Sequence, residues 1–270
     1  MPRVLLTDVL RADYERCFDA CRIRPERLSD VDALAGRIAA ARSRYEAVER
    51  MLGVPWYVVG VVHCMECGLD FTRHLHNGDP LTARTVRVPA GRPALGSPPF
   101  AWEDSATDAL RLRGLDRWSD WSVGGALYQL EGYNGWGYRL YHPRVGTPYL
   151  WSFSNQYTSG KYVADGRWSA DTMSKQCGAA VLLRRMFEQS IIGFATPRAP
   201  IATPPAVHPE PLVRFWTGGP ETQAARELQE FLNRVAGADL AVDGKPGEKT
   251  SDVLRRVTGH YLIGDPRDAA

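Results

Sequence analysis

The sequence predicts a mainly α protein of two domains: a larger α+β domain with a small β-hairpin, and a small three-helix domain. Apolar residues recur at helical spacing through much of the chain, which favours helices. One short segment, 82–88, is instead rich in β-branched residues and follows a tight-turn signal. A segment with six prolines, 195–211, separates residues 1–194 from residues 212–270, as an extended linker does.

Length and charge limit the classes of protein to consider. A chain of 270 residues can bury one substantial core and still form a second small domain. Its net charge of +2 is far from that of a strongly basic nucleic-acid binder, so we expect no nucleic-acid partner. No apolar segment is long enough to span a membrane, and residues 1–17 lack the apolar core of a signal peptide. We expect a monomer made in the cytoplasm without a signal peptide, and no membrane partner.

The five cysteines form no obvious secreted disulfide framework. A run of histidines and cysteines suggests zinc, but its spacing fits no standard structural zinc pattern: His63, Cys64, Cys67, His74 and His76. Cys64 and Cys67 are more simply explained as small buried apolar residues. We therefore expect no metal and no cofactor.

Residues 3–50 are expected to be helical, with Ser29 as a candidate N-cap. Apolar residues recur there at near-helical spacing: Leu34, Ile38, Tyr45, Val48 and Leu52. We interpret this part as a scaffold that packs beneath the next segment.

Segment 54–68 is apolar on nearly every side, which is typical of an element buried in the core. Its valines suit a buried strand equally well, but Pro55 as a first helical residue and Gly68 as a stop leave room for about three helical turns. On the helical interpretation, Glu66 lies at the end of a buried helix. Burial raises the pKa of a carboxyl group and prepares it for general acid catalysis, although a lone glutamate at a helix end is more often simply solvated.

The next segment predicts a β-hairpin, with a turn at Asn77-Gly78 and a strand over 82–88. This hairpin would carry Asp79 and, six positions later, Thr85. The order of buried helix, glutamate and hairpin resembles the lysozyme superfamily, in which the glutamate faces a hairpin across a sugar cleft. The resemblance implies that Glu66 is the catalytic acid, that Asp79 orients water or stabilises the transition state, and that Thr85 holds the water. The gap between Glu66 and Asp79 is longer here than in phage-type lysozymes.

Two further helices are expected over 102–113 and 121–133, and the second runs into Tyr133-Asn134-Gly135. This piece resembles the alanine-tyrosine-asparagine-glycine segment of lytic transglycosylases and goose-type lysozymes, with Gly132 in place of the alanine. The resemblance implies that Tyr133 and Asn134 lie in the cleft opposite the catalytic glutamate. Apart from this resemblance, an Asn-Gly pair after a helix is a common turn sequence.

Aromatic residues are dense from Tyr133 to Trp168, and about half of them are expected in the core. The others could stack on sugar rings. We take as substrate-binding candidates Tyr133, Asn134, Trp136, Tyr138 and Trp151. A helix capped by Ser169 is expected to close the domain over 169–189.

Past the linker, Ala224 to Val235 is amphipathic and predicts a helix. The turn at Asp243-Gly244, with Thr250 as the cap of the following helix, resembles that of the small helical peptidoglycan-binding domain. The two resemblances, the first over about residues 45–190, point to the same polymer.

Together the two resemblances imply a muramidase that hydrolyses the β-1,4 bond between N-acetylmuramic acid and N-acetylglucosamine of peptidoglycan. Such an enzyme acts at the cell wall. Asp70 and Glu131 are reserves for the second carboxylate, after Asp79. Three alternatives stay open: a lytic transglycosylase that gives 1,6-anhydro products, a wall-binding protein without activity, and an enzyme acting on chitin or chitosan. The sequence does not distinguish a phage lysis enzyme from a bacterial toxin.

Overall fold

The computed structural model describes residues 4–164, 166–195 and 213–269. The chain divides into two compact units, residues 1–198 and 199–270, and the division falls inside the expected linker. Most of that linker, 196–212, lies outside the described residues. The described part is mainly helical with one small antiparallel sheet, so the predicted fold class is confirmed. Among these residues, no helix combines the length and apolarity needed to cross a membrane.

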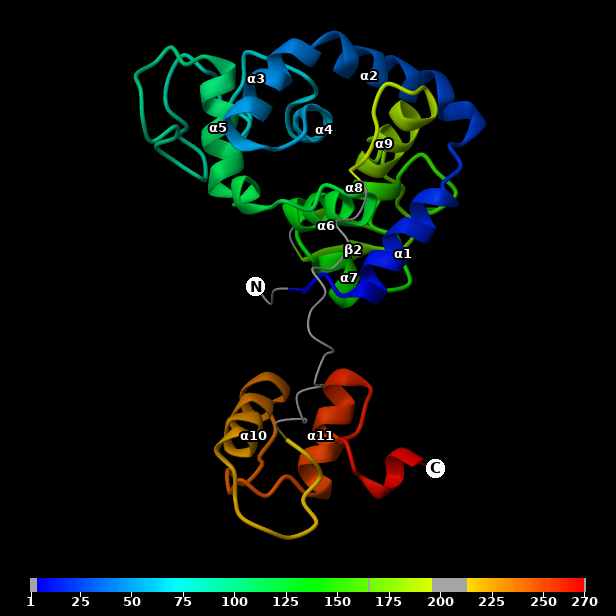
Figure 1. Ribbon diagram of the computed structural model, residues 1–270, viewed down its shortest axis with the longest axis vertical. Coiled ribbons are helices and arrows are strands. Elements are labelled where there is room, and N and C mark those ends of the chain that lie inside the picture. Colours follow the sequence, from blue (N-terminus) through cyan, green and yellow to red (C-terminus); the bar gives the residue numbers. More distant parts are fainter. Residues whose placement is uncertain (1–3, 165, 196–212, 270) are drawn as a thin grey trace. The chain divides into compact units, whose positions relative to one another are not determined.

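The helices of the first unit are α1 (Asp8–Asp19), α2 (Leu28–Ala40), α3 (Arg42–Leu52), α4 (Trp56–Cys67), α5 (Trp102–Leu112), α6 (Val123–Asn134), α7 (Gly137–Tyr141), α8 (Pro148–Trp151) and α9 (Ala179–Glu188). Helix α4 is the most buried helix of the first unit and lies in its upper part in Figure 1, close to α2, α3 and α9. Two 3-10 turns, Pro25–Arg27 and Leu115–Arg117, complete the helical part. The predicted helical segment 3–50 is thus divided into three helices, and Ser29 lies inside α2 instead of capping it.

Helix α4 confirms the helical interpretation of segment 54–68. It packs against α2, α3 and α9, so an apolar surface on all sides is buried. Gly60 allows α4 to pack closely against α2, because a Cβ at this position would lie 2.6 Å from a methyl group of Ile38. Pro55 is the N-cap and not the first helical residue. Gly68 ends the helix in the left-handed conformation, with φ of 60°, as expected of a C-terminal glycine.

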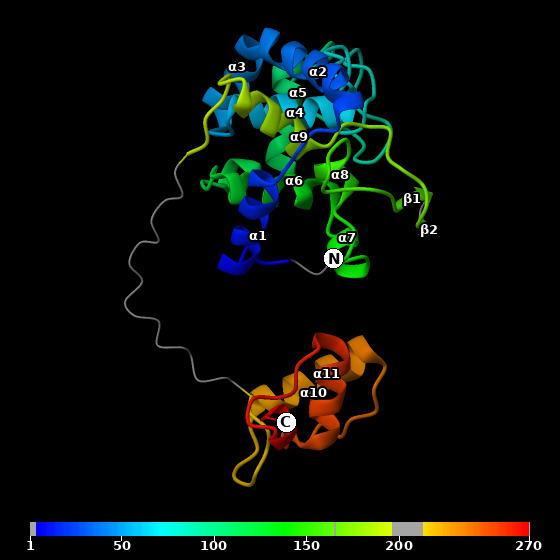
Figure 2. The ribbon, with the colours of Figure 1, turned by 90° about the vertical axis from the view of Figure 1, so that its right-hand side faces the viewer.

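The two-stranded sheet forms at a different place from the predicted hairpin. Strands β1 (Lys161–Ala164) and β2 (Arg167–Ser169) pair antiparallel and project beside the helices (Figure 2). Segment 82–88 is described throughout and none of it is a strand, so that prediction is wrong. Ser169 ends β2 and caps no helix, because α9 begins only at Ala179, after Gly178.

The second unit is built from α10 (Gln223–Ala236), α11 (Glu248–Thr258) and a final 3-10 turn, Pro266–Ala269. Its small core is centred on Leu232, Leu240 and Val253. Buried Gln229 accepts a hydrogen bond from the backbone N–H of Gly244 and donates one to Asp243 Oδ1, at 2.8 Å each, which fixes the predicted turn. Thr250 lies inside α11, whose N-cap is Gly247, so the expected cap is wrong.

Candidate functional site

Glu66 occupies the last turn of α4, one residue before Cys67 ends the helix. Its side chain reaches solvent, yet the carboxyl group lies among enough protein atoms to lose part of its hydration. This partial burial raises the pKa of Glu66 above its ordinary value. A hydrogen bond from Tyr149 and the charge of Arg113 oppose the rise but do not cancel it. Glu66 therefore holds its proton to higher pH than a free glutamate.

Two tyrosines from different helices surround this carboxyl group. Tyr149 of α8 donates a hydrogen bond from its hydroxyl to Glu66 Oε1 at 2.9 Å. Tyr133 of α6 is near enough that the charge of Glu66, together with burial, raises its pKa. Arg113, just after α5, places its guanidinium 4.8 Å from the centroid of the Tyr133 ring. Side chains from α6, α8 and the end of α5 thus meet at the Glu66 carboxyl group of α4.

We call Glu66, Tyr149, Tyr133 and Arg113 the Glu66 cluster. Two hollows border this cluster, one at each tyrosine. One, of about 450 Å³, is lined by Tyr149 together with Asn134, Tyr138 and Lys161. The other, of about 510 Å³, is lined by Arg113 and Tyr133 together with Trp136. Among the described residues the Asn134 amide has no hydrogen-bond partner, so it is available to a ligand. Hollows of this volume with aromatic walls suit sugar rings.

Four of the predicted substrate-binding residues line these hollows: Tyr133, Asn134, Trp136 and Tyr138. The fifth does not. Trp151 is 5% exposed, belongs to the hydrophobic core, and borders a separate cavity beside Arg139. Its neighbour on α8, Tyr149, makes the contact with Glu66 instead. Sequence reasoning missed Tyr149 and Arg113, because no local pattern tells which aromatic or basic side chain reaches a residue distant in the chain.

Asp79 lies in a different environment from the one predicted for a catalytic partner. Its Oδ2 accepts hydrogen bonds from the backbone N–H groups of Val86 and Arg87, at 2.8 and 3.0 Å. Its Oδ1 forms an ion pair with the Arg87 guanidinium at 2.7 Å. These bonds lower the pKa of Asp79 to about 2. Both oxygens are therefore occupied in closing the loop between Asp79 and Arg87.

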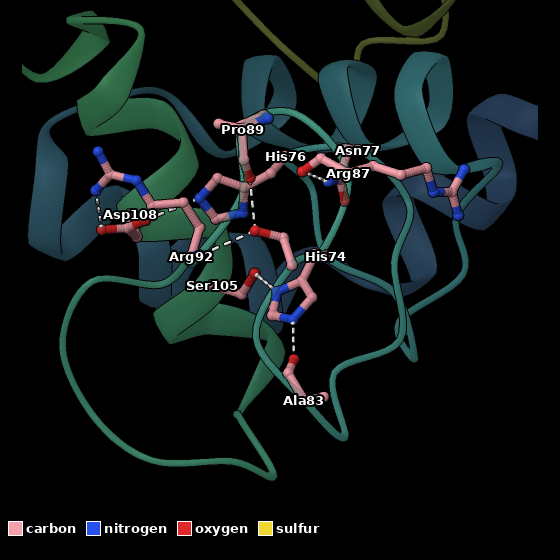
Figure 3. Close-up of polar contacts among 10 residues, drawn as sticks. His74, His76, Asn77, Ala83, Arg87, Pro89, Arg92, Ser105 and Asp108 are labelled. Atoms are coloured by element: carbon pink, nitrogen blue, oxygen red, sulfur yellow. Dashed lines mark hydrogen bonds and ion pairs between the residues drawn. The ribbon is translucent and has the colours of Figure 1, made fainter.

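Thr85 is likewise part of the loop, which is tied to α5. The Thr85 hydroxyl donates to the Pro89 carbonyl at 2.6 Å and accepts from the Arg92 N–H at 2.9 Å. Figure 3 shows the surrounding network, in which His74 Nδ1 lies 2.7 Å from the Ser105 hydroxyl. In the same view His76 contacts Asp108 of α5 at 2.8 Å, and Asn77 donates to the Arg87 carbonyl. These contacts within the protein account for the conformation of this segment, and no substrate is needed to explain it.

The two reserve carboxylates also have other partners. Asp70 accepts hydrogen bonds from the N–H and hydroxyl of Thr72 and pairs with Arg73, which lowers its pKa to about 2. Glu131 is 2% exposed and is held by Tyr14 and by the Arg139 guanidinium. Among the described residues, neither of them nor Asp79 contacts Glu66. Of the carboxylates considered, Glu66 alone is available for chemistry.

The histidines and cysteines form no metal site in the described part of the chain, since no three potential ligands converge there. Burial raises the pKa of Cys64 to about 11 and that of Cys67 to about 12, so both stay neutral thiols. His63 is buried against Tyr45, whose hydroxyl lies 3.1 Å from its Nδ1. These residues belong to the packing of α4.

No family model, curated protein or solved structure matches this chain. The function therefore has to be inferred from the geometry and electrostatics of the Glu66 cluster.

Proposed function

We propose that this protein cleaves the β-1,4 bond between N-acetylmuramic acid and N-acetylglucosamine in peptidoglycan, with Glu66 as the general acid. The observation that carries the proposal is the Glu66 carboxyl group, whose pKa is raised by burial and whose neighbours Tyr149 and Tyr133 line two hollows with aromatic walls. A general acid for glycoside cleavage needs this raised pKa, because it must hold a proton near neutral pH and release it to the leaving oxygen. Residues 213–269 would hold the enzyme on the wall.

The neighbours of Glu66 suit the charge change in this step. When Glu66 gives its proton to the glycosidic oxygen, the C1–O4 bond breaks and a carboxylate is left behind. The Tyr149 hydroxyl already donates to Glu66 Oε1, and a donated hydrogen bond favours the charged form. The positive charge of Arg113 also favours the carboxylate form of Glu66. Tyr133 and Asn134 would position the sugar at the cut.

The environment of the other carboxylates favours the transglycosylase reaction over the hydrolase reaction. An inverting hydrolase needs a second carboxylate roughly 6.5–9.5 Å from the acid to activate water. Asp79, the residue predicted for that role, has both oxygens committed to its own loop. With one carboxylate, the muramic acid 6-hydroxyl attacks C1 and returns its proton to Glu66. The product then carries a 1,6-anhydro end and no water is consumed.

Digestion of purified peptidoglycan in ¹⁸O-labelled water tests this assignment. We expect products that end in 1,6-anhydromuramic acid, lighter by one water than the hydrolysis products and free of ¹⁸O by mass spectrometry. Reducing ends that carry one ¹⁸O would establish the muramidase reaction instead and would require a water-activating group. If folded wild-type protein releases no fragments from the peptidoglycan, glycan cleavage is refuted altogether.

A further inference from the structure

A third hollow, of about 490 Å³, lies against the last turn of α4 on the side of α2. Its floor is apolar and includes Met65, Cys177 and Phe153, all less than a tenth exposed. Met65 directly precedes Glu66 in the sequence, so the hollow borders the same helical turn that holds the acid. The hollow is not needed for the chemistry described above, and its walls differ from those of the two aromatic hollows.

The rim of the hollow is cationic. Arg27, Arg37 and Lys175 line it, and the one acidic residue there, Asp30, is paired with Arg27 at 3.1 Å. The Arg27 guanidinium lies 4.6 Å from the centroid of the Phe153 ring. Arg37 donates to the Gly68 carbonyl at 3.2 Å, so its direction is set by the end of α4. Lys175 has no partner among the described residues, which leaves its charge available to an anion. A neutral sugar chain would gain nothing from three cations.

The hollow is also connected to the sugar-binding side. Gln176 lines both this hollow and the one that contains Tyr149. Its amide donates to the Met65 carbonyl at 2.6 Å, which fixes the side chain between the two. A ligand with a branch beside the Glu66 cluster can therefore occupy both hollows at once.

We infer that the third hollow binds the acidic peptide that branches from muramic acid in peptidoglycan; this inference rests on the proposed function. The free carboxylates of such a peptide complement the rim of Arg27, Arg37 and Lys175, and its alanine methyl groups suit the apolar floor. The branch point on the sugar and the shared Gln176 explain why a separate cationic hollow with an apolar floor adjoins the sugar-binding side.

Cleavage of glycan strands with and without their peptides tests the inference. Wild-type protein should cleave peptide-bearing strands with a kcat/KM about fivefold higher than that for enzymatically stripped strands. Lys175→Glu should abolish this ratio. Arg50→Glu makes the same charge change at an exposed position of α3 that does not line the hollow, and should keep the ratio. Equal cleavage of both strands by wild-type protein, or equal loss of the ratio in both variants, would overturn the inference and leave the proposed function intact.

Binding of a synthetic wall-stem peptide with two free carboxylates, measured by calorimetry without any glycan, separates this inference from the proposed function. We expect wild-type and Arg50→Glu proteins to bind it and Lys175→Glu to bind at least about fivefold more weakly. Peptide binding of this pattern without cleavage of either strand would support the hollow while refuting the glycan reaction. Undetectable peptide binding to wild-type protein would count against the hollow, whatever the strands show.

Discussion

Glu66 and Asp79 are both acidic residues next to a sharp turn, and they end in opposite environments. Among the described residues Glu66 has a single hydrogen-bond donor, Tyr149, and burial raises its pKa. Asp79 has two backbone donors and a guanidinium, and these lower its pKa to about 2. The first carboxyl group can hold and transfer a proton, whereas the second is a permanent anion that closes a loop. The comparison shows that the chemistry of a carboxylate depends on what its oxygens already bind.

The largest expected effect comes from removing the proton of Glu66. Glu66→Gln should lower the rate of wall cleavage by on the order of a hundred- to ten-thousand-fold, because general acid catalysis contributes that much. In the wild-type protein, activity should fall as pH rises through the raised pKa of Glu66. Turbidity of permeabilised cells and a melting curve measure activity and folding together. A folded Glu66→Gln protein with near-normal activity would remove the basis of the site.

Tyr149→Phe should have an intermediate effect. The hydroxyl stabilises the carboxylate left after proton transfer, so its loss should lower kcat on the order of tenfold. The same hydrogen bond lowers the pKa of Glu66, so the alkaline limb of the pH profile should move to higher pH. Tyr138→Phe is the control, since Tyr138 lines the same hollow and does not touch Glu66. An identical pH profile in wild type and Tyr149→Phe would contradict this role.

Asp79→Asn should have the smallest effect on cleavage and a clear effect on stability. Activity per folded molecule should stay within about twofold of wild type, while the melting temperature near neutral pH falls by several degrees. Because the folded-state pKa is lowered, the contribution of Asp79 is present above its ordinary value of 3.8 and is lost as pH falls toward about 2. The difference in melting temperature between the two proteins should therefore disappear over that range.

Asp13→Asn is the matched control for this prediction, because Asp13 forms an exposed ion pair with Arg16 within α1 and should change stability little. A stable Asp79→Asn protein with a hundredfold loss of activity would reverse the comparison. Asp79 would then be the water-activating carboxylate, and the muramidase reaction would be restored.

Local sequence was enough to determine the end of α4 and the position of Glu66 on it. A run of apolar residues must be buried, and Gly68 adopts the left-handed conformation that ends a helix. The same holds for Tyr133 and Asn134, which end α6 before Gly135. These features depend on residues within a few positions of each other, so the sequence states them directly.

The role of Asp79 and Thr85 depended on contacts that the sequence does not state. Segment 82–88 has the β-branched composition of a strand, but Asp79 takes the N–H groups of Val86 and Arg87 that a strand would offer to a neighbour. The backbone of Thr85 is paired with Arg92 in the same loop. The polar side chains thus compete successfully with strand pairing, and propensity alone cannot predict that outcome.

The partner of Glu66 was likewise decided by tertiary structure. Trp151 and Tyr149 lie two positions apart on α8, and no local pattern distinguishes the one that reaches Glu66. Packing of α8 in the first unit buries Trp151 in the core and brings the Tyr149 hydroxyl to a carboxyl group 83 residues away in the chain. The sequence by itself determined the buried helix and the position of Glu66 in its last turn. Only the packing of distant helices determined which groups adjust the pKa of Glu66, because that depends on which side chains meet in space.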